Sequence, residues 1–131
     1  MQQIIISTRD QETSDLILTA FRQFPGLMPY AVETPELTEA ARNSACSAIV
    51  TDLDPDQAGH SDQLRELQRV APNAELCLIS KGKRSGRLAQ QKREFNLFTT
   101  IQRPINAFDV ARRILRLQSH LTATRPATTG V

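Results

Sequence analysis

Five short apolar segments alternate along this chain with longer segments in which apolar residues recur every three or four positions. Short β-branched segments are typical of buried strands, and the longer spacing is typical of helices that pack on a sheet. Their alternation indicates right-handed βαβ units. We therefore expect an α/β doubly wound fold, a five-stranded parallel sheet with helices on both faces. The expected strands are Gln3–Ser7, Met28–Glu33, Ser47–Thr51, Leu76–Ile79 and Leu97–Gln102.

Polar residues mark the expected helix starts. Asp10, Ser61 and Asn106 each precede an apolar periodic segment, and Thr34 precedes Pro35. Short polar side chains cap helix N-termini by accepting hydrogen bonds from free backbone N–H groups. We expect all four residues to be caps. The segment Lys81–Asn96 is the weakest helical pattern in the chain.

Composition indicates one soluble domain. The chain has 131 residues, of which 40% are hydrophobic and 23% charged, as in globular proteins. We expect a folded domain over residues 1–119 and a disordered tail or linker over 120–131. No apolar segment is long enough to cross a bilayer and no signal-peptide pattern is visible, so we expect a cytoplasmic protein without membrane insertion.

The cysteines and histidines do not indicate a metal or catalytic site. Cys46 and Cys77 lie at or within expected strands, and we expect buried free thiols. His60 and His120 are far apart and are not grouped with other ligands. No nucleophilic triad, zinc pattern or phosphate loop occurs, so we expect no enzyme activity and no cofactor.

Charge is divided unevenly along the chain. Residues 1–80 contain 5 basic and 12 acidic side chains, whereas residues 81–131 contain 11 basic and 2 acidic ones. The net charge of +2 therefore combines −7 and +9. Such segregation gives one face of a molecule a definite sign, which selects its partners.

Three expected strands are followed by an acid, a hydroxyl and a cation. Asp52 follows the third strand, Ser80 the fourth, and Arg103 with Pro104 the fifth. The carboxyl ends of parallel strands form one crevice, where ligands bind. We therefore expect these side chains to lie together.

This order of residues resembles the receiver domain of bacterial response regulators over about residues 2–118. The resemblance puts Asp52 at the phosphoacceptor, Ser80 at the hydroxyl that contacts the phosphoryl group, and Arg103-Pro104 at the Lys-Pro pair. It also implies the strand order 2-1-3-4-5, in which the second strand is an edge. Pro29 agrees, because proline within a sheet is confined to edges.

The resemblance fails at the metal site. Receivers hold Mg²⁺ with an acidic pair after the first strand, but Thr8 and Arg9 occupy those positions here, with Asp10 one step further. Magnesium requires hard oxygen ligands, and a guanidinium repels it. We expect Arg9 to form an ion pair with Asp52 in the metal position, and Arg103 to pair bidentately with the same carboxylate. Pro55 follows Asp52 by three residues instead of four, which leaves open whether Asp54 faces the crevice.

A second departure concerns the output surface. Thr100 stands where receivers commonly carry a switching aromatic residue. In receivers the fourth helix, fifth strand and fifth helix form the face for dimerisation and output, and here that face is basic. Its expected charged residues are Lys81, Lys83, Arg84, Arg87, Lys92, Arg93, Arg112, Arg113 and Arg116.

These observations leave three possible functions. The first is a degenerate receiver that acts by protein–protein contact or self-association through this face, without Mg²⁺-dependent phosphorylation. In this respect the chain resembles the atypical receiver modules at the start of larger regulators, including pilus-assembly localisation ATPases of the TadZ/CpaE kind. The second is a working receiver that a histidine kinase phosphorylates on Asp52, with Asp10 or Asp54 helping to hold Mg²⁺. The third is nucleic-acid binding through the basic helices, which the lack of interleaved aromatic residues disfavours.

Overall fold

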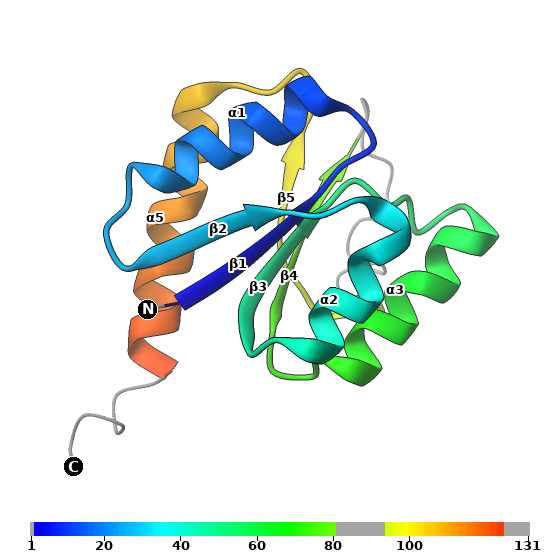
Figure 1. The fold of residues 1–131 in the computed structure, drawn as a ribbon. Helices are drawn as coiled ribbons and strands as arrows, with labels where there is room; N and C mark the ends of the chain where they lie inside the picture. The colour runs from blue at the N-terminus through cyan, green and yellow to red at the C-terminus, as the bar shows by residue number, and fades with distance from the viewer. Residues whose placement is uncertain (1, 81–93, 125–131) are drawn as a thin grey trace, which may run out of the picture.

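The computed structural model describes residues 2–80 and 94–124. A five-stranded, fully parallel sheet with strand order β2-β1-β3-β4-β5 forms the centre of this part of the chain (Figure 1). The expected fold class and strand order are confirmed. The strands are β1 Gln2–Ser7, β2 Leu27–Ala31, β3 Cys46–Thr51, β4 Glu75–Ser80 and β5 Leu97–Gln102.

Helices cover both faces of the sheet. Helices α1 and α5 lie on one face, and α2 and α3 lie on the other (Figure 1). The described helical elements are α1 Gln11–Arg22, the 3₁₀ turn η1 Thr34–Glu36, α2 Leu37–Asn43, α3 Ala58–Val70 and α5 Ala107–Thr124. Most of the expected helix at Lys81–Asn96 lies outside the described residues.

Alternate residues of each central strand feed two separate cores. Ile4 and Ile6 of β1 pack with α1 and α5, whereas Ile5 packs with α2 and α3. Side chains of a strand point alternately to its two faces, so a continuous isoleucine run fits a strand that is covered on both sides. Cys46 and Cys77 are buried in these cores as free thiols, and burial raises the pKa of Cys77 to about 12.

Two of the four expected caps are confirmed. The Asp10 side chain accepts a hydrogen bond from the backbone N–H of Thr13, and Asn106 Oδ1 accepts one from Asp109 N at 3.0 Å. The cap at Ser61 is wrong because α3 begins at Ala58. Ser61 therefore lies inside the first turn, where its hydroxyl donates to the carbonyl of Ala58 at 3.0 Å.

The expected cap at Thr34 is also wrong. Thr34 is the first residue of η1, after Glu33 as N-cap, so its hydroxyl cannot cap the turn that contains it. The Ser7 hydroxyl instead donates to Thr34 Oγ1 at 3.4 Å. This contact ties the end of β1 to the segment that follows β2.

The folded unit extends past residue 119, where we expected the domain to end. Helix α5 runs to Thr124, and Leu121 is 3% exposed within the α1–α5 core. The His120 ring contacts Phe98 with centroids 5.0 Å apart and hydrogen-bonds Glu75 at 2.9 Å. The rest of the expected tail, residues 125–131, lies outside the described residues. None of the described helices is long and apolar enough to cross a membrane.

Substitution of Leu121 by alanine tests this boundary. We expect Leu121→Ala to lower the free energy of unfolding by about 2–4 kcal/mol, because it removes a buried side chain and leaves a cavity. Ser119→Ala, at an exposed position of the same helix, is the control, with a change within about 0.5 kcal/mol. Urea denaturation measures both values. Equal, small changes would place Leu121 outside the cooperative unit.

Candidate functional site

The carboxyl edge of the sheet brings together residues from three strand ends. Asp52 follows β3 and is 7% exposed, Ser80 ends β4, and Arg103 follows β5. Arg103 N donates to the carbonyl of Ser80 at 2.9 Å. The Arg103–Pro104 peptide bond is cis.

Arg9 holds Asp52 through three contacts. Its backbone N–H donates to Oδ2 at 3.1 Å, its Nε to Oδ1 at 3.4 Å, and its Nη2 to the carbonyl oxygen of Asp52 at 3.0 Å. The Asp52 side chain is only 6% exposed, whereas that of Arg9 is 49% exposed. The ion pair that we expected from the sequence is present, with the guanidinium at the mouth of the crevice.

Arg103 contacts the same carboxylate without pairing bidentately, so that expectation is wrong. Its Nη2 lies 3.7 Å from Asp52 Oδ2, while Nη1 donates to Thr13 Oγ1 at 2.9 Å and lies 3.8 Å from Asp10 Oδ2. The N-terminus of α1 offers these acceptors on the other side of the guanidinium. Arg103 therefore bridges β3 and α1 instead of placing both nitrogens on one carboxylate.

Thr8 and Asp10 form hydrogen bonds that stabilise the start of α1. Thr8 Oγ1 donates to the carbonyl of Asp10 at 2.8 Å and shares a hydrogen bond with the Ser14 hydroxyl at 2.7 Å. Asp10 Oδ2 accepts from the Thr13 N–H and hydroxyl. The Thr13 hydroxyl, with a smaller contribution from Arg103, lowers the pKa of Asp10 below 3.8.

Asp54 is used within the loop that follows Asp52. Its Oδ1 accepts from Asp56 N at 2.9 Å, and its own N–H donates to His60 Nδ1 at 2.9 Å. Asp52, which Arg9 and Arg103 contact, is therefore the residue that faces the crevice. Within residues 2–80 and 94–124, no three His, Cys, Asp or Glu side chains lie close enough together to hold a metal ion.

Only part of the expected output face can be described. Thr100 is half-buried on β5, and Arg116 is exposed on α5. Arg112 is 72% exposed, and Arg112 Nη2 and Arg113 Nε each lie 2.9 Å from an Asp109 carboxylate oxygen. The expected basic residues Lys81, Lys83, Arg84, Arg87, Lys92 and Arg93 lie outside the described residues.

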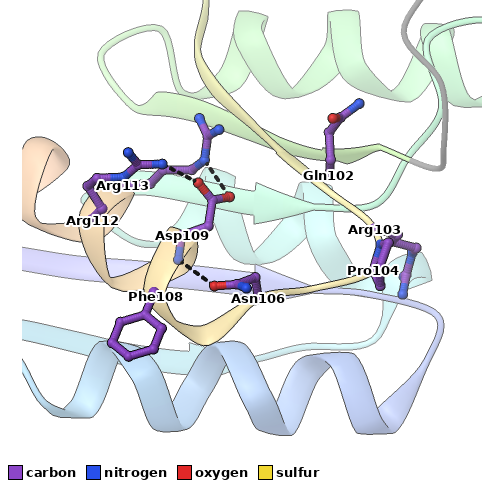
Figure 2. Close-up of a pocket in the computed structure, with 8 residues that line it drawn as sticks. All are labelled: Gln102, Arg103, Pro104, Asn106, Phe108, Asp109, Arg112 and Arg113. Carbon is purple, nitrogen blue, oxygen red and sulfur yellow. Dashed lines mark hydrogen bonds and ion pairs between the residues drawn. The ribbon is translucent and has the colours of Figure 1, made fainter.

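A pocket of about 870 Å³ adjoins the crevice, where the loop after β5 meets α5 (Figure 2). This pocket was not among the sequence predictions, and Phe108, an apolar residue in the first turn of α5, is 88% exposed beside it. The signal was its position: Val110, Ile114, Leu117 and Leu121 follow one helical stripe, and residue 108 lies off it. The lining residues are Gln102, Arg103, Pro104, Asn106, Phe108, Asp109, Arg112 and Arg113.

Solved structures with the same fold include response regulators and a pilus assembly protein. A response regulator from Thermotoga maritima matches with a TM-score of 0.76 at 12% identity, over 91% of this chain and 98% of that one. A pilus assembly protein (CpaE) from Burkholderia thailandensis matches at 0.74 and 11%, over 91% and 99%. The chemotaxis response regulator CheY4 of Vibrio cholerae matches at 0.70 and 12%, over 89% and 98%.

The sequence itself matches no protein-family model and no curated protein. The structural neighbours therefore establish the fold alone: this chain has the fold of CheY-like response-regulator receiver domains. The fold that the Asp52, Ser80 and Arg103-Pro104 pattern predicted is confirmed.

Removing the Arg9 side chain should destabilise the domain. We expect Arg9→Ala to lower the free energy of unfolding by about 1–2 kcal/mol, because the buried Asp52 carboxylate loses one of its two charged partners. Arg22→Ala, at an exposed position near the end of α1, is the control and should change stability by less than about 0.5 kcal/mol. Urea denaturation at neutral pH measures both. An Arg9→Ala variant as stable as Arg22→Ala would contradict the contacts described.

Acid denaturation should depend on Asp10. Its pKa is lower in the folded state than the reference value of 3.8, so its stabilising contribution is present above about pH 4 and is lost as the pH falls below it. Asn still caps a helix. We therefore expect Asp10→Asn to lose less stability than the wild type between about pH 4 and pH 2, measured by urea denaturation across that range. Identical slopes would refute the assignment.

Proposed function

We propose that this domain is a signalling module that works by protein–protein contact, with its receiver crevice held in one state and without enzymatic activity. The observation that supports this most strongly is the set of three Arg9 contacts with Asp52, one of which is an ion pair, to which Arg103 adds a second ion pair. The carboxylate that would accept a phosphoryl group in a receiver is thus already neutralised by two cations.

The residues around Asp52 do not fit magnesium. Mg²⁺ requires several oxygen ligands in near-octahedral geometry. The Arg9 guanidinium lies within 3.4 Å of the carboxylate that would provide one ligand, and Asp10 is engaged by Thr13 and Arg103. Phosphoryl transfer depends on neutralising charge that develops on the transferred oxygens. Without the metal, the crevice lacks the group that receivers use for this purpose.

The partner that we propose is an acidic protein surface. The pocket beside the crevice is lined by Arg103, Arg112 and Arg113 against the single carboxylate of Asp109. The exposed ring of Phe108 at the same pocket (Figure 2) adds an aromatic anchor of the kind that is enriched at protein interfaces. Charge complementarity speeds and orients such association. The expected basic residues of the preceding helix would extend this surface, and the cytoplasm would be the compartment in which the domain meets its partner.

The competing function is phosphorylation of Asp52 by a histidine kinase. One observation favours it: Asp52, Ser80 and Arg103 follow or end strands β3, β4 and β5, which are neighbours in the sheet. Nucleic-acid binding is the third function, and its expected residues Lys83, Arg84 and Arg87 lie outside the described part of the chain. Reversal of those three charges, combined with a salt titration, tests it separately.

A magnesium titration distinguishes the proposal from its main competitor. We expect Arg9→Asp to gain a metal response, because it restores a carboxylate and removes the repelling cation. With a dissociation constant of about 1 mM, Mg²⁺ at about 10 mM would raise the free energy of unfolding by about 1.4 kcal/mol. Urea denaturation with and without the metal measures this change.

Arg9→Asn is the matched control, because it removes the cation without adding a carboxylate. The wild type and Arg9→Asn should both show no stabilisation by Mg²⁺. A wild type that is stabilised as much as Arg9→Asp would overturn the proposal and favour the phosphoacceptor. An Arg9→Asp variant without any response would remove Arg9 as the reason for exclusion of the metal.

A further inference from the structure

Helices α1 and α5 expose large apolar side chains that the folded domain does not cover. Leu16 of α1 is 36% exposed, and on α5 Phe108 is 88% and Leu115 54% exposed. The ring of Phe108 projects away from its helix (Figure 2). Among the described residues only one other large hydrophobic residue is exposed, Met28, which lies on β2. Apolar side chains gathered on neighbouring elements are typical of interaction sites.

These residues share one outer surface. Helices α1 and α5 lie side by side on one face of the sheet (Figure 1). Arg103 Nη1 bonds Thr13 at 2.9 Å near their N-terminal ends, and Gln118 Nε2 donates to the carbonyl of Pro25 at 2.8 Å near their C-terminal ends. The two helices therefore run in the same direction.

Helical spacing places the apolar residues near the junction of the two helices. Leu115 lies three residues before Gln118, which contacts the end of the α1 segment, and Phe108 lies seven residues before Leu115. Residues at these spacings share one side of a helix. Leu16 lies three residues after Thr13, which contacts Arg103. We call the surface formed by Leu16, Phe108, Leu115 and the charged residues around them the α1–α5 surface.

The two halves of the α1–α5 surface have opposite charge. Glu12 and Asp15 are exposed in the first turns of α1, where Arg22 is the only basic residue between positions 11 and 22. Arg112 and Arg116 are exposed on α5, and Asp109 is the only acidic residue of that helix. Asp109 pairs with both Arg112 and Arg113, which still leaves a positive surplus.

We infer that the α1–α5 surface binds a second copy of this chain, with α1 of each copy across α5 of the other. An isologous two-fold contact uses the same patch twice and must therefore be complementary to itself. Opposite charges on adjacent helices, around a shared apolar centre, meet this requirement. The alternative two-fold arrangement, α1 against α1, would place Glu12 and Asp15 opposite their own copies.

A purely acidic partner fits the α1–α5 surface less well than a second copy, because Glu12 and Asp15 would repel it. Asp52 takes no part in the contact, so the self-association does not depend on whether Asp52 accepts a phosphoryl group. The contact shares Phe108 and Arg112 with the pocket proposed above for an acidic partner, so a second copy and that partner would compete for these residues. The inference does not rest on the proposed function, because it requires only the exposed apolar and charged residues of the α1–α5 surface.

Analytical ultracentrifugation of the full chain, up to about 1 mM, measures this association. We expect a concentration-dependent dimer whose dissociation constant rises at least about tenfold in Phe108→Asp. Met28→Asp is the matched control: it is also an exposed apolar residue, but Leu27 before it packs in the α1–α5 core, so Met28 points to the other face. The dissociation constant of the Met28→Asp dimer should equal that of the wild type.

A charge exchange identifies the orientation of the contact. Glu12→Lys/Asp15→Lys and Arg112→Glu/Arg116→Glu should each weaken the dimer alone, because like charges then face each other. An equimolar mixture of the two variants should associate again as a heterodimer. Circular dichroism of each variant shows that it is folded, and restoration in the mixture separates loss of contact from loss of structure.

Three results would overturn the inference. A wild type that stays monomeric throughout the concentration range would remove the interface. A dimer equally sensitive to Phe108→Asp and Met28→Asp, or insensitive to both, would place the contact elsewhere. A mixture that does not associate, although each folded variant alone has lost the dimer, would exclude the α1-on-α5 orientation.

Discussion

The buried carboxylate of Asp52 constrains the rest of the crevice. A carboxylate that is 6% exposed must be paired or hydrogen-bonded, because an unpaired charge in that place costs several kcal/mol. Arg9 after β1 and Arg103 after β5 provide this pairing. Asp52 thereby joins the ends of β1, β3 and β5, and Arg103 extends these contacts to the start of α1. The same contacts are the reason why we propose that the crevice does not hold a divalent cation.

The order of the strands in the sheet brings Arg9, Asp52 and Arg103 together, although these residues are far apart in the sequence. Parallel strands in the order β2-β1-β3-β4-β5 put the residues after β1 and β3 next to each other, although Arg9 and Asp52 are 43 positions apart. Apolar side chains of β1 alternate between two cores, so a shift by one residue would move Ile4 and Ile6 from the core under α1 and α5 to the core under α2 and α3. The register of the sheet therefore fixes which strand ends meet in the crevice.

The sequence predicted the contacts that depend on which strands are neighbours. It did not predict contacts for which several side chains compete once the helices have packed. The Arg9–Asp52 pair followed from the topology because neighbouring parallel strands end at one edge. The orientation of the Arg103 guanidinium could not be predicted, because Thr13 and Asp10 become alternative partners for it only when α1 packs against the sheet. The exposure of Phe108 follows only from its helical phase, which puts it off the stripe of buried residues on α5. The predicted end of the domain at residue 119 is too early. Leu121 follows polar residues in the sequence, yet its side chain packs in the core.

Intact-mass spectrometry after incubation with a small-molecule phosphodonor and Mg²⁺ tests the central claim most directly. An ordinary receiver labelled in parallel shows that the conditions suffice, and Asp52→Ala identifies the site. The account predicts that the wild type gains no phosphoryl-sized mass, because Arg9 and Arg103 already neutralise Asp52. A mass gain in the wild type that disappears in Asp52→Ala would contradict it and would establish a working phosphoacceptor.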